Sequence, residues 1–342
     1  MKGPDLRLGA LRRFALAITV VNVLGHSVFG FESSLAQMFV ALGTAYSVEL
    51  LLEVVAAWDE KRAVRFRGGF INLMNFLLPA HITGLAIGML LYANDQLLPF
   101  AFASTVAIAS KSVFTAPVGK SQRHFMNPSN FGLVISYLMF RDVAATVVPY
   151  QYTIDLYGFG DWLLPTVTIF TGSFLNTRFT RRIPLVLAWV GGFIGQAVLR
   201  HLFFGASLVP TLSPITGEAF MLFTFYMVPD PGTTPSKKSR QILFGLSVAL
   251  TYGVIVSLHI GFALFFALAL VCIVRGVALH VLNYMALREV AAGEAVGSPA
   301  FAVARGPSVA AARPAGNIVQ AALDAVATGP VRSAKLDVES GV

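Results

Sequence analysis

The sequence has little charge and almost no cysteine. Charged residues make up 12% of its 342 residues, whereas soluble domains carry roughly 25%. The single cysteine, Cys272, excludes a disulfide within the chain and an iron–sulfur cluster held by cysteines of this chain alone. Glycine-rich nucleotide loops and the GxSxG, HExxH and CxxC motifs are also absent. No soluble-enzyme signature is therefore present.

Apolar residues dominate the chain. Hydrophobic residues account for 56% of it, and the mean hydropathy is +0.72. About ten apolar runs approach the roughly 17–25 residues that a membrane-spanning helix needs, although some are short. They cover residues 14–30, 35–58, 71–93, 97–114, 131–148, 162–175, 184–204, 219–228, 242–258 and 261–281. The sequence predicts an all-α, polytopic membrane helix bundle with about ten spans.

Basic residues gather in alternate loops between these runs, which places both termini in the cytoplasm. The same bias explains the net charge of +8 without a nucleic-acid partner. Residues 1–13 are expected to be cytoplasmic, residues 14–287 to form the transmembrane domain, and residues 288–342, rich in Ala, Gly, Pro and Ser, to be a disordered cytoplasmic tail. The short sixth and eighth runs are typical of half-helices, and an inverted internal repeat is one hypothesis.

The segment FYMVPDPGTTP ends an apolar run with a polar turn. Pro229 and Pro231 cannot donate backbone hydrogen bonds, and they bracket Asp230. Thr233 and Thr234 follow. Irregular polar backbone persists at membrane depth only where protein or a water-filled cavity surrounds it. We expect a ligand site at this turn.

Other polar residues inside the predicted spans allow two interpretations each. Glu49 and Glu53 lie four residues apart, on one face of the second span, and could form a proton or cation path or pair with a neighbouring helix. His81 is more typical of a histidine that packs between helices than of a titrating group. In TGSFLNTRFTRR (Thr171–Arg182), the arginines could bind an anion, but they fit a loop that fixes topology better.

Four segments resemble one protein family. They read HITGL (81–85), AIASKSVF…HFMNPSNFG (107–132), TGSFLNTR…LAWVGGF (171–193) and FTFYMVPDPGTTP…RQILFGL (223–246). In order and spacing they are similar to the RnfD/NqrB family, whose members are membrane components of the Rnf electron-transport complex and of the sodium-pumping NADH:quinone reductase. The chain also resembles a divergent branch of this family that is associated with enediyne natural-product biosynthesis.

The resemblance implies a multi-pass protein of the bacterial cytoplasmic (inner) membrane that binds flavin and supports ion-coupled electron transfer. The family carries FMN on a threonine in a loop motif that residues 141–161 lack, so we expect a noncovalent FMN or riboflavin. Lys111 or Arg178 would then neutralise a reduced flavin. The expected cofactor-binding residues are Thr83, Gly84, Lys111, Asn127, Pro128, Asn130, Ser173, Asn176, Thr177, Arg178, Asp230, Pro231, Thr233 and Thr234.

Two other readings stay open. On the same scaffold the chain could be a transporter for a small metabolite or natural product without redox activity, or a membrane anchor for a partner enzyme. If it takes part in electron transport, as the family resemblance implies, it would be at most one component of a membrane oxidoreductase. Its partners would then be other electron-transport proteins or further copies of itself. Neither a catalytic residue nor a metal site is expected within the chain.

Overall fold

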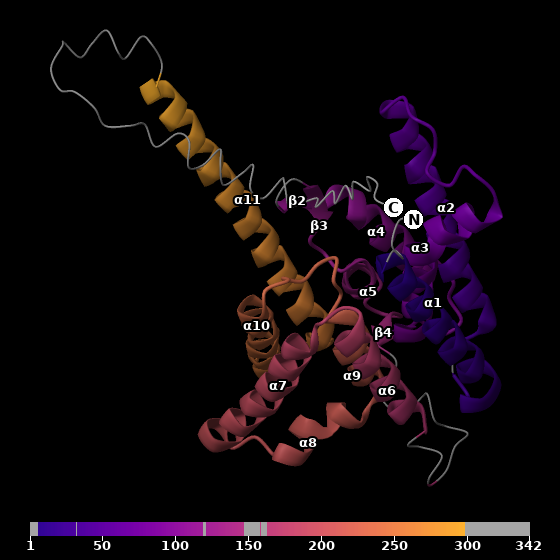
Figure 1. The fold of residues 1–342 in the computed structure, drawn as a ribbon. Coiled ribbons are helices and arrows are strands. Elements are labelled where there is room, and N and C mark those ends of the chain that lie inside the picture. Colours follow the sequence, from indigo (N-terminus) through magenta and orange to yellow (C-terminus); the bar gives the residue numbers. More distant parts are fainter. Residues whose placement is uncertain (1–5, 32, 119–120, 147–157, 159–162, 298–342) are drawn as a thin grey trace, which may run out of the picture. The chain divides into compact units, whose positions relative to one another are not determined.

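The structure is a computed structural model that describes residues 6–31, 33–118, 121–146, 158 and 163–297 (Figure 1). Most of these residues are helical. The helices are α1 (Leu6–Leu24), α2 (Leu35–Asp59), α3 (Phe70–Leu90), α4 (Leu98–Val113), α5 (Pro128–Met139), α6 (Leu163–Arg178), α7 (Ile183–Phe204), α8 (Leu208–Leu212), α9 (Glu218–Leu222), α10 (Lys238–Ser257) and α11 (Ala263–Gly297). Shorter helical turns are η1 (Gly25–Phe29), η4 (Ser213–Thr216) and η5 (Phe223–Met227).

Two short antiparallel pairs connect the helices. Strand β1 (Leu91–Tyr92) pairs with β4 (Ala145–Thr146), with Leu91 opposite Thr146. Strand β2 (Thr115–Val118) pairs with β3 (Ser121–His124), with Thr115 opposite His124. The second pair forms a hairpin between α4 and α5, and it carries polar side chains toward the site described below.

Local sequence signals explain where two of the central helices begin. The Ser34 hydroxyl accepts a hydrogen bond from the Gln37 backbone N–H at 3.2 Å, and the Gln37 side chain accepts one from the Ser34 N–H at 2.9 Å. This capping box gives acceptors to backbone N–H groups at the start of α2 that would otherwise have no hydrogen-bond partner. Helix α5 starts with Pro128 in its first turn and Asn127 as the cap, a favoured combination because proline lacks the N–H that this turn cannot use.

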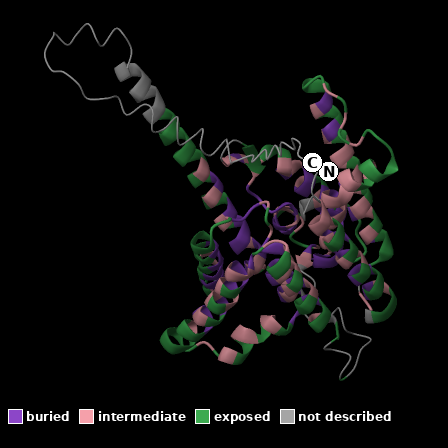
Figure 2. Ribbon diagram, in the orientation of Figure 1, coloured by how far each residue is buried: buried purple, intermediate pink, exposed green. Residues whose placement is uncertain are grey.

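The protein is an α-helical, multi-pass membrane protein. Six of the described helices are long and apolar enough to span a membrane, or seven if the bent pair Leu208–Thr216 and Ala219–Met227 counts as one span. Many large apolar side chains on the outside of the helices are exposed, which suits contact with lipid (Figure 2). Each of the ten predicted runs contains a helix, but several of these helices are too short for a crossing by this measure, and the run at 131–148 is helical only to Met139. The count of about ten spans, the sidedness and the inverted repeat stay predictions.

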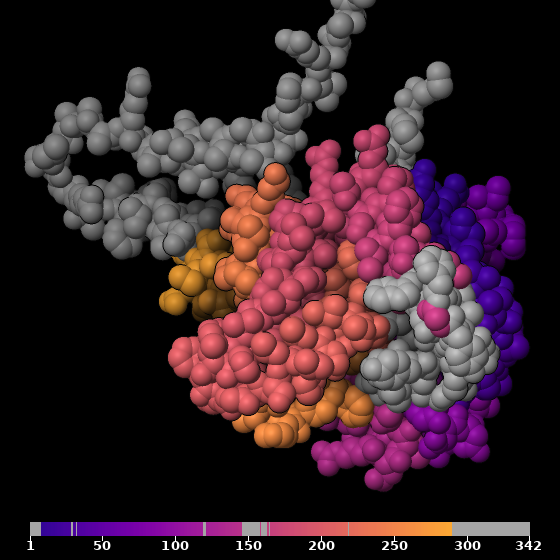
Figure 3. All heavy atoms as spheres, turned by 90° about the horizontal axis from the view of Figure 1, so that it is seen from below, coloured from indigo at the N-terminus to yellow at the C-terminus, as the bar shows by residue number. Residues whose placement is uncertain are grey.

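The helices of residues 1–280 pack in two groups. Helix α3 contacts α1 and α2, and α4 contacts α2 and α5, while α7 packs along α10 (Figure 1). The second group surrounds Trp189, whose buried ring contacts the rings of Phe193, Phe220, Phe223 and Tyr252. On the face shown in Figure 3, the rose and salmon segments from α6 to η5 form one continuous surface.

The chain divides into two units, residues 1–280 and 281–342. Helix α11 begins in the first unit and continues to Gly297, past the point near Arg288 where the tail was expected to start. The rest of the predicted tail, and most of the predicted loop at residues 141–161, lie outside the described residues.

Candidate functional site

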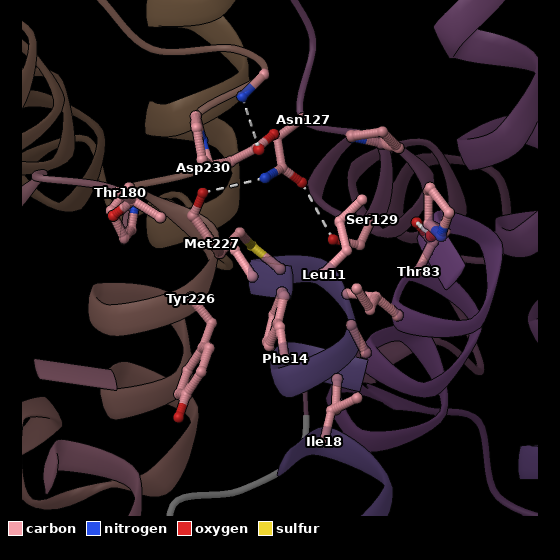
Figure 4. A pocket seen from close by; sticks show the side chains of 18 of the residues that line it. Leu11, Phe14, Ile18, Thr83, Asn127, Ser129, Thr180, Tyr226, Met227 and Asp230 are labelled. Carbon is pink, nitrogen blue, oxygen red and sulfur yellow. Dashed lines mark hydrogen bonds between the residues drawn. The ribbon is translucent and has the colours of Figure 1, made fainter. Parts of the chain in front are cut away.

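A cavity of about 1070 Å³ lies within the first unit. Its wall is built from α1, α3, α6 and η5, together with the β2–β3 hairpin, the start of α5 and the turn at Pro229–Gly232. We call it the Asp230 cavity. Figure 4 shows Asp230 and Asn127 at one end of the view and Phe14, Tyr226 and Ile18 toward the other. A cavity of this size suits a drug-sized ligand, since such sites commonly measure about 300–1,000 Å³.

The helix that passes the cavity is broken, and asparagine side chains repair the break. In a continuing α-helix the carbonyls of Phe225 and Met227 would bond to the N–H groups four residues on, but those residues are Pro229 and Pro231. The Asn176 amide donates to the Phe225 carbonyl at 2.7 Å, and the Asn127 amide donates to the Met227 carbonyl at 3.0 Å. Two of the predicted site residues therefore supply donors to carbonyls at the cavity wall that have no partner within the helix.

The turn that follows is closed by its own hydrogen bonds. The Asp230 carboxylate accepts from the Gly232 N–H at 3.0 Å and from the Thr233 hydroxyl at 3.2 Å. The Thr234 hydroxyl donates to the Asp230 carbonyl at 2.6 Å. Both threonines are buried, so they stabilise the turn, while Asp230 itself lines the cavity.

The apolar half of the cavity contains a pair of aromatic rings. Phe14 of α1 and Tyr226 of η5 stack with their centroids 4.9 Å apart and their planes 13° apart. The Tyr226 hydroxyl is hydrogen bonded to the Thr171 hydroxyl at 2.5 Å. This wall can receive a flat apolar ring system, because aromatic faces favour stacked or offset contacts.

The polar half of the cavity contains a buried arginine. Arg182, directly before α7, is 5% exposed, and its guanidinium donates to the Pro235 carbonyl. Its Nε is buried and has no partner among the described residues. Burial lowers the pKa of Arg182, and the nearby charges of Arg275 and Arg123 lower it further, while Asp230 opposes the shift. The site is therefore electrostatically suited to an anion.

Glu49 and Glu53 of α2 are both ion paired. Lys111 Nζ lies 2.8 Å from Glu49 Oε2, and both residues line the cavity. The Glu53 carboxylate is buried, ion paired with Arg62 and bonded to the Arg65 N–H at 2.7 Å. These contacts support the interpretation of Glu49 and Glu53 as paired residues. They also leave Lys111 with its charge already matched, so it adds little net charge toward a ligand.

The predicted site residues divide into two groups. Those that line the cavity are Thr83, Lys111, Asn127, Pro128, Asn176, Asp230 and Pro231. Those that do not are Gly84, Asn130, Ser173, Thr177, Arg178, Thr233 and Thr234. In the second group, Asn130 donates to the Phe265 carbonyl at 3.0 Å, Gly84 lies against the backbone of α2, and Arg178 is exposed. The structure thus gives Asn130 and Gly84 packing roles.

Several residues that the prediction left out also line the cavity. Phe14 comes from the first helix, which carried no polar signal and no part of the family resemblance. Arg123 and His124 come from the hairpin, and His124 reads in sequence as a loop residue. Arg182 belongs to the segment for which anion binding was the weaker of two interpretations. Its position directly before the apolar run of α7 was the available signal.

His81 lies in a small network away from the charged turn. Its ring is hydrogen bonded to the Thr19 hydroxyl at 2.7 Å and to the Tyr46 hydroxyl at 2.5 Å, which joins α1, α2 and α3. This agrees with a histidine that packs between helices. Within the described ranges, no group of three or more His, Cys, Asp or Glu side chains could hold a metal ion. Comparison of the sequence with known protein families and with curated proteins found no match.

Proposed function

We propose that this membrane protein binds a flavin noncovalently in the Asp230 cavity and takes part in membrane electron transport. One observation supports this most strongly. The four segments that resemble the RnfD/NqrB family all contribute to the wall of the same cavity, through residues such as Ile82, Lys111, Leu175 and Asp230. One ligand that contacts all four segments would account for this arrangement.

The residues of the cavity fit such a ligand. The stacked pair Phe14 and Tyr226 offers an aromatic wall for the ring system. Thr83, Ser129 and Thr180 place hydroxyl oxygens along the lining as acceptors, since their hydrogens are bonded within the protein, and Arg182 supplies positive charge. A bound flavin supplies the redox chemistry itself, so the protein has only to position it and set its electrostatic surroundings.

The direct test is the flavin content of the protein. Purification in mild detergent, a visible absorption spectrum, and mass spectrometry of the denatured protein would separate three results. Near-stoichiometric free flavin supports the proposal. Flavin retained on a peptide contradicts its noncovalent part. A folded preparation without flavin in either fraction refutes it.

A matched pair of variants ties the flavin to this cavity. Phe14→Leu removes one ring from the aromatic wall, and we expect flavin binding to weaken by about two- to tenfold, the range that one aromatic contact supplies. Phe39→Leu makes the same change at a side chain that is 61% exposed on α2, and it should leave binding unchanged. Equally tight flavin binding by both variants would contradict a flavin site in this cavity.

A second function is favoured by one observation. The helix pair Leu208–Thr216 and Ala219–Met227 is bent by 71°, and its second limb reaches the cavity wall at Leu222 and Phe225. Broken spans at a central cavity are typical of secondary transporters. A transporter of small organic anions would take up FMN into liposomes that contain the protein. That uptake should be lost with Arg182→Met, which removes positive charge from the cavity, and the purified protein should contain no flavin.

A further inference from the structure

The charges around Arg182 do not balance within the described residues. Arg182 forms no ion pair there, and neither do Arg123, which also lines the cavity, or Arg275 of α11. The carboxylate that acts electrostatically on Arg182 is that of Asp230, and part of its hydrogen-bonding capacity is used within its own turn. The charges of Arg123 and Arg275 act on Arg182 with the same sign, and Asp230 supplies the opposing charge.

An excess of positive charge in a partly buried site is costly. Removal of a charge from water without a partner is among the most unfavourable changes in a folded protein. Arg182 is 5% exposed, and one of its donors, Nε, has no acceptor among the described residues. Of the buried side-chain polar atoms without a partner in that part of the chain, Nε of Arg182 is the one that belongs to a residue lining the cavity.

The kind of ligand follows from charge and shape. Guanidinium groups bind phosphate and carboxylate oxygens in a planar, two-pronged geometry, and they are favoured at phosphate sites. A carboxylate would balance one positive charge, whereas three arginines against one aspartate leave two. A phosphate monoester, which is close to a dianion at neutral pH, matches that excess.

We propose that Arg182, together with Arg123, forms an oxyanion subsite at the polar end of the Asp230 cavity that takes a phosphate monoester. The subsite deepens the proposed function because it would select a phosphorylated ligand over the same ligand without phosphate. It uses the same cavity, but it does not require the rest of the ligand to be a flavin.

The chain offers a matched control for this subsite. Arg182→Met removes the charge and keeps much of the side-chain volume. Arg178→Gln removes an exposed arginine from the last turn of α6, outside the cavity lining. Arg123→Gln removes an exposed arginine that lines the cavity, and it provides a second test if Arg182→Met fails to fold.

The experiment measures binding of inorganic phosphate and of phenyl phosphate by calorimetry, with the full chain in neutral-lipid nanodiscs. We expect the wild type and Arg178→Gln to bind both probes. Arg182→Met should bind about ten- to a hundredfold more weakly, because it loses a charge-assisted hydrogen bond, and Arg123→Gln should be weakened in the same direction. A folded wild type that binds neither probe, or Arg182→Met and Arg123→Gln variants that bind as the wild type does, would overturn the proposal.

Two further arms identify the source of the phosphate. Tighter binding of FMN than of riboflavin, lost in Arg182→Met, assigns the subsite to a soluble phosphate ester. Displacement of phenyl phosphate by phosphatidic acid in the nanodisc assigns it to a lipid headgroup, and both results support the subsite. Phosphate binding by a protein that holds no flavin would refute only the proposed function. Riboflavin in the purified protein without any phosphate binding would refute only the subsite.

Discussion

Replacement of Asn127 with serine should destabilise the protein through one lost donor. The Asn127 side chain has two functions: its Oδ1 accepts from the Asn130 N–H and caps α5, and its Nδ2 donates to the Met227 carbonyl, 100 residues away. Serine is as good a helix cap as asparagine, but it is too short to reach Met227. The variant therefore separates the bond between the two segments from the cap.

The size of the effect follows from the burial of both partners. Asn127 and Met227 are buried, and Pro231 gives the Met227 carbonyl no helical donor to replace the lost one. A buried polar group left without a partner costs about 1–3 kcal/mol, which we expect for Asn127→Ser. Asn127→Ala also loses the cap, which adds about 0.5–2 kcal/mol. The difference between the two variants measures the cap alone.

Unfolding by SDS titration in mixed micelles, followed by circular dichroism, reports the free energy of each variant. Asn72→Ser is the control, because Asn72 is exposed and should change stability by no more than about 0.5 kcal/mol. An Asn127→Ser variant as stable as this control would show that water in the cavity solvates the Met227 carbonyl. The argument that asparagine repairs the helix break would then fail.

Two other stability predictions use the same titration. Gly245→Ala should cost about 1–3 kcal/mol, because an added Cβ would lie 2.6 Å from the Leu185 carbonyl oxygen and 2.9 Å from the Trp189 nitrogen. Gly191→Ala, where an added Cβ would meet nothing within 4 Å, should be neutral, and equal losses would contradict close packing of α7 and α10. Glu53→Gln should cost about 1–3 kcal/mol because it weakens charge-assisted bonds from Arg62 and the Arg65 N–H. A loss no larger than that of exposed Asp59→Asn would count against this pairing.

Composition and apolar runs were sufficient to predict the class of fold. Each predicted run contains a helix, because a backbone in lipid has to satisfy its own hydrogen bonds and a helix does so within one segment. The run at 219–228 shows what hydropathy alone does not resolve. It folds as α9 followed by η5, bent relative to the helix before it, and hydropathy does not distinguish such a limb from a full crossing.

The turn at Pro229–Pro231 was predictable as a cavity wall, since its prolines and lone carboxylate are visible in the sequence. The opposite wall was not. Phe14 reaches the cavity because α1 packs on α3, and a run of apolar residues gives no sign of which side faces a ligand. The hairpin residue Arg123 likewise reads as one more basic loop residue until β2 and β3 place it at the cavity.

Polar residues in a membrane protein stabilise broken backbone as well as bind ligands, and their residue types alone do not separate the two roles. Asn130, Asn176, Thr233 and Thr234 were all predicted as ligand contacts, and all four donate to backbone carbonyls. A side chain whose donors are already used inside the protein has less left for a ligand. Arg182 differs because it is buried, charged and short of an acceptor among the described residues. The unmet donor, rather than the polar residue type, is therefore the better indicator of where a ligand binds in this cavity.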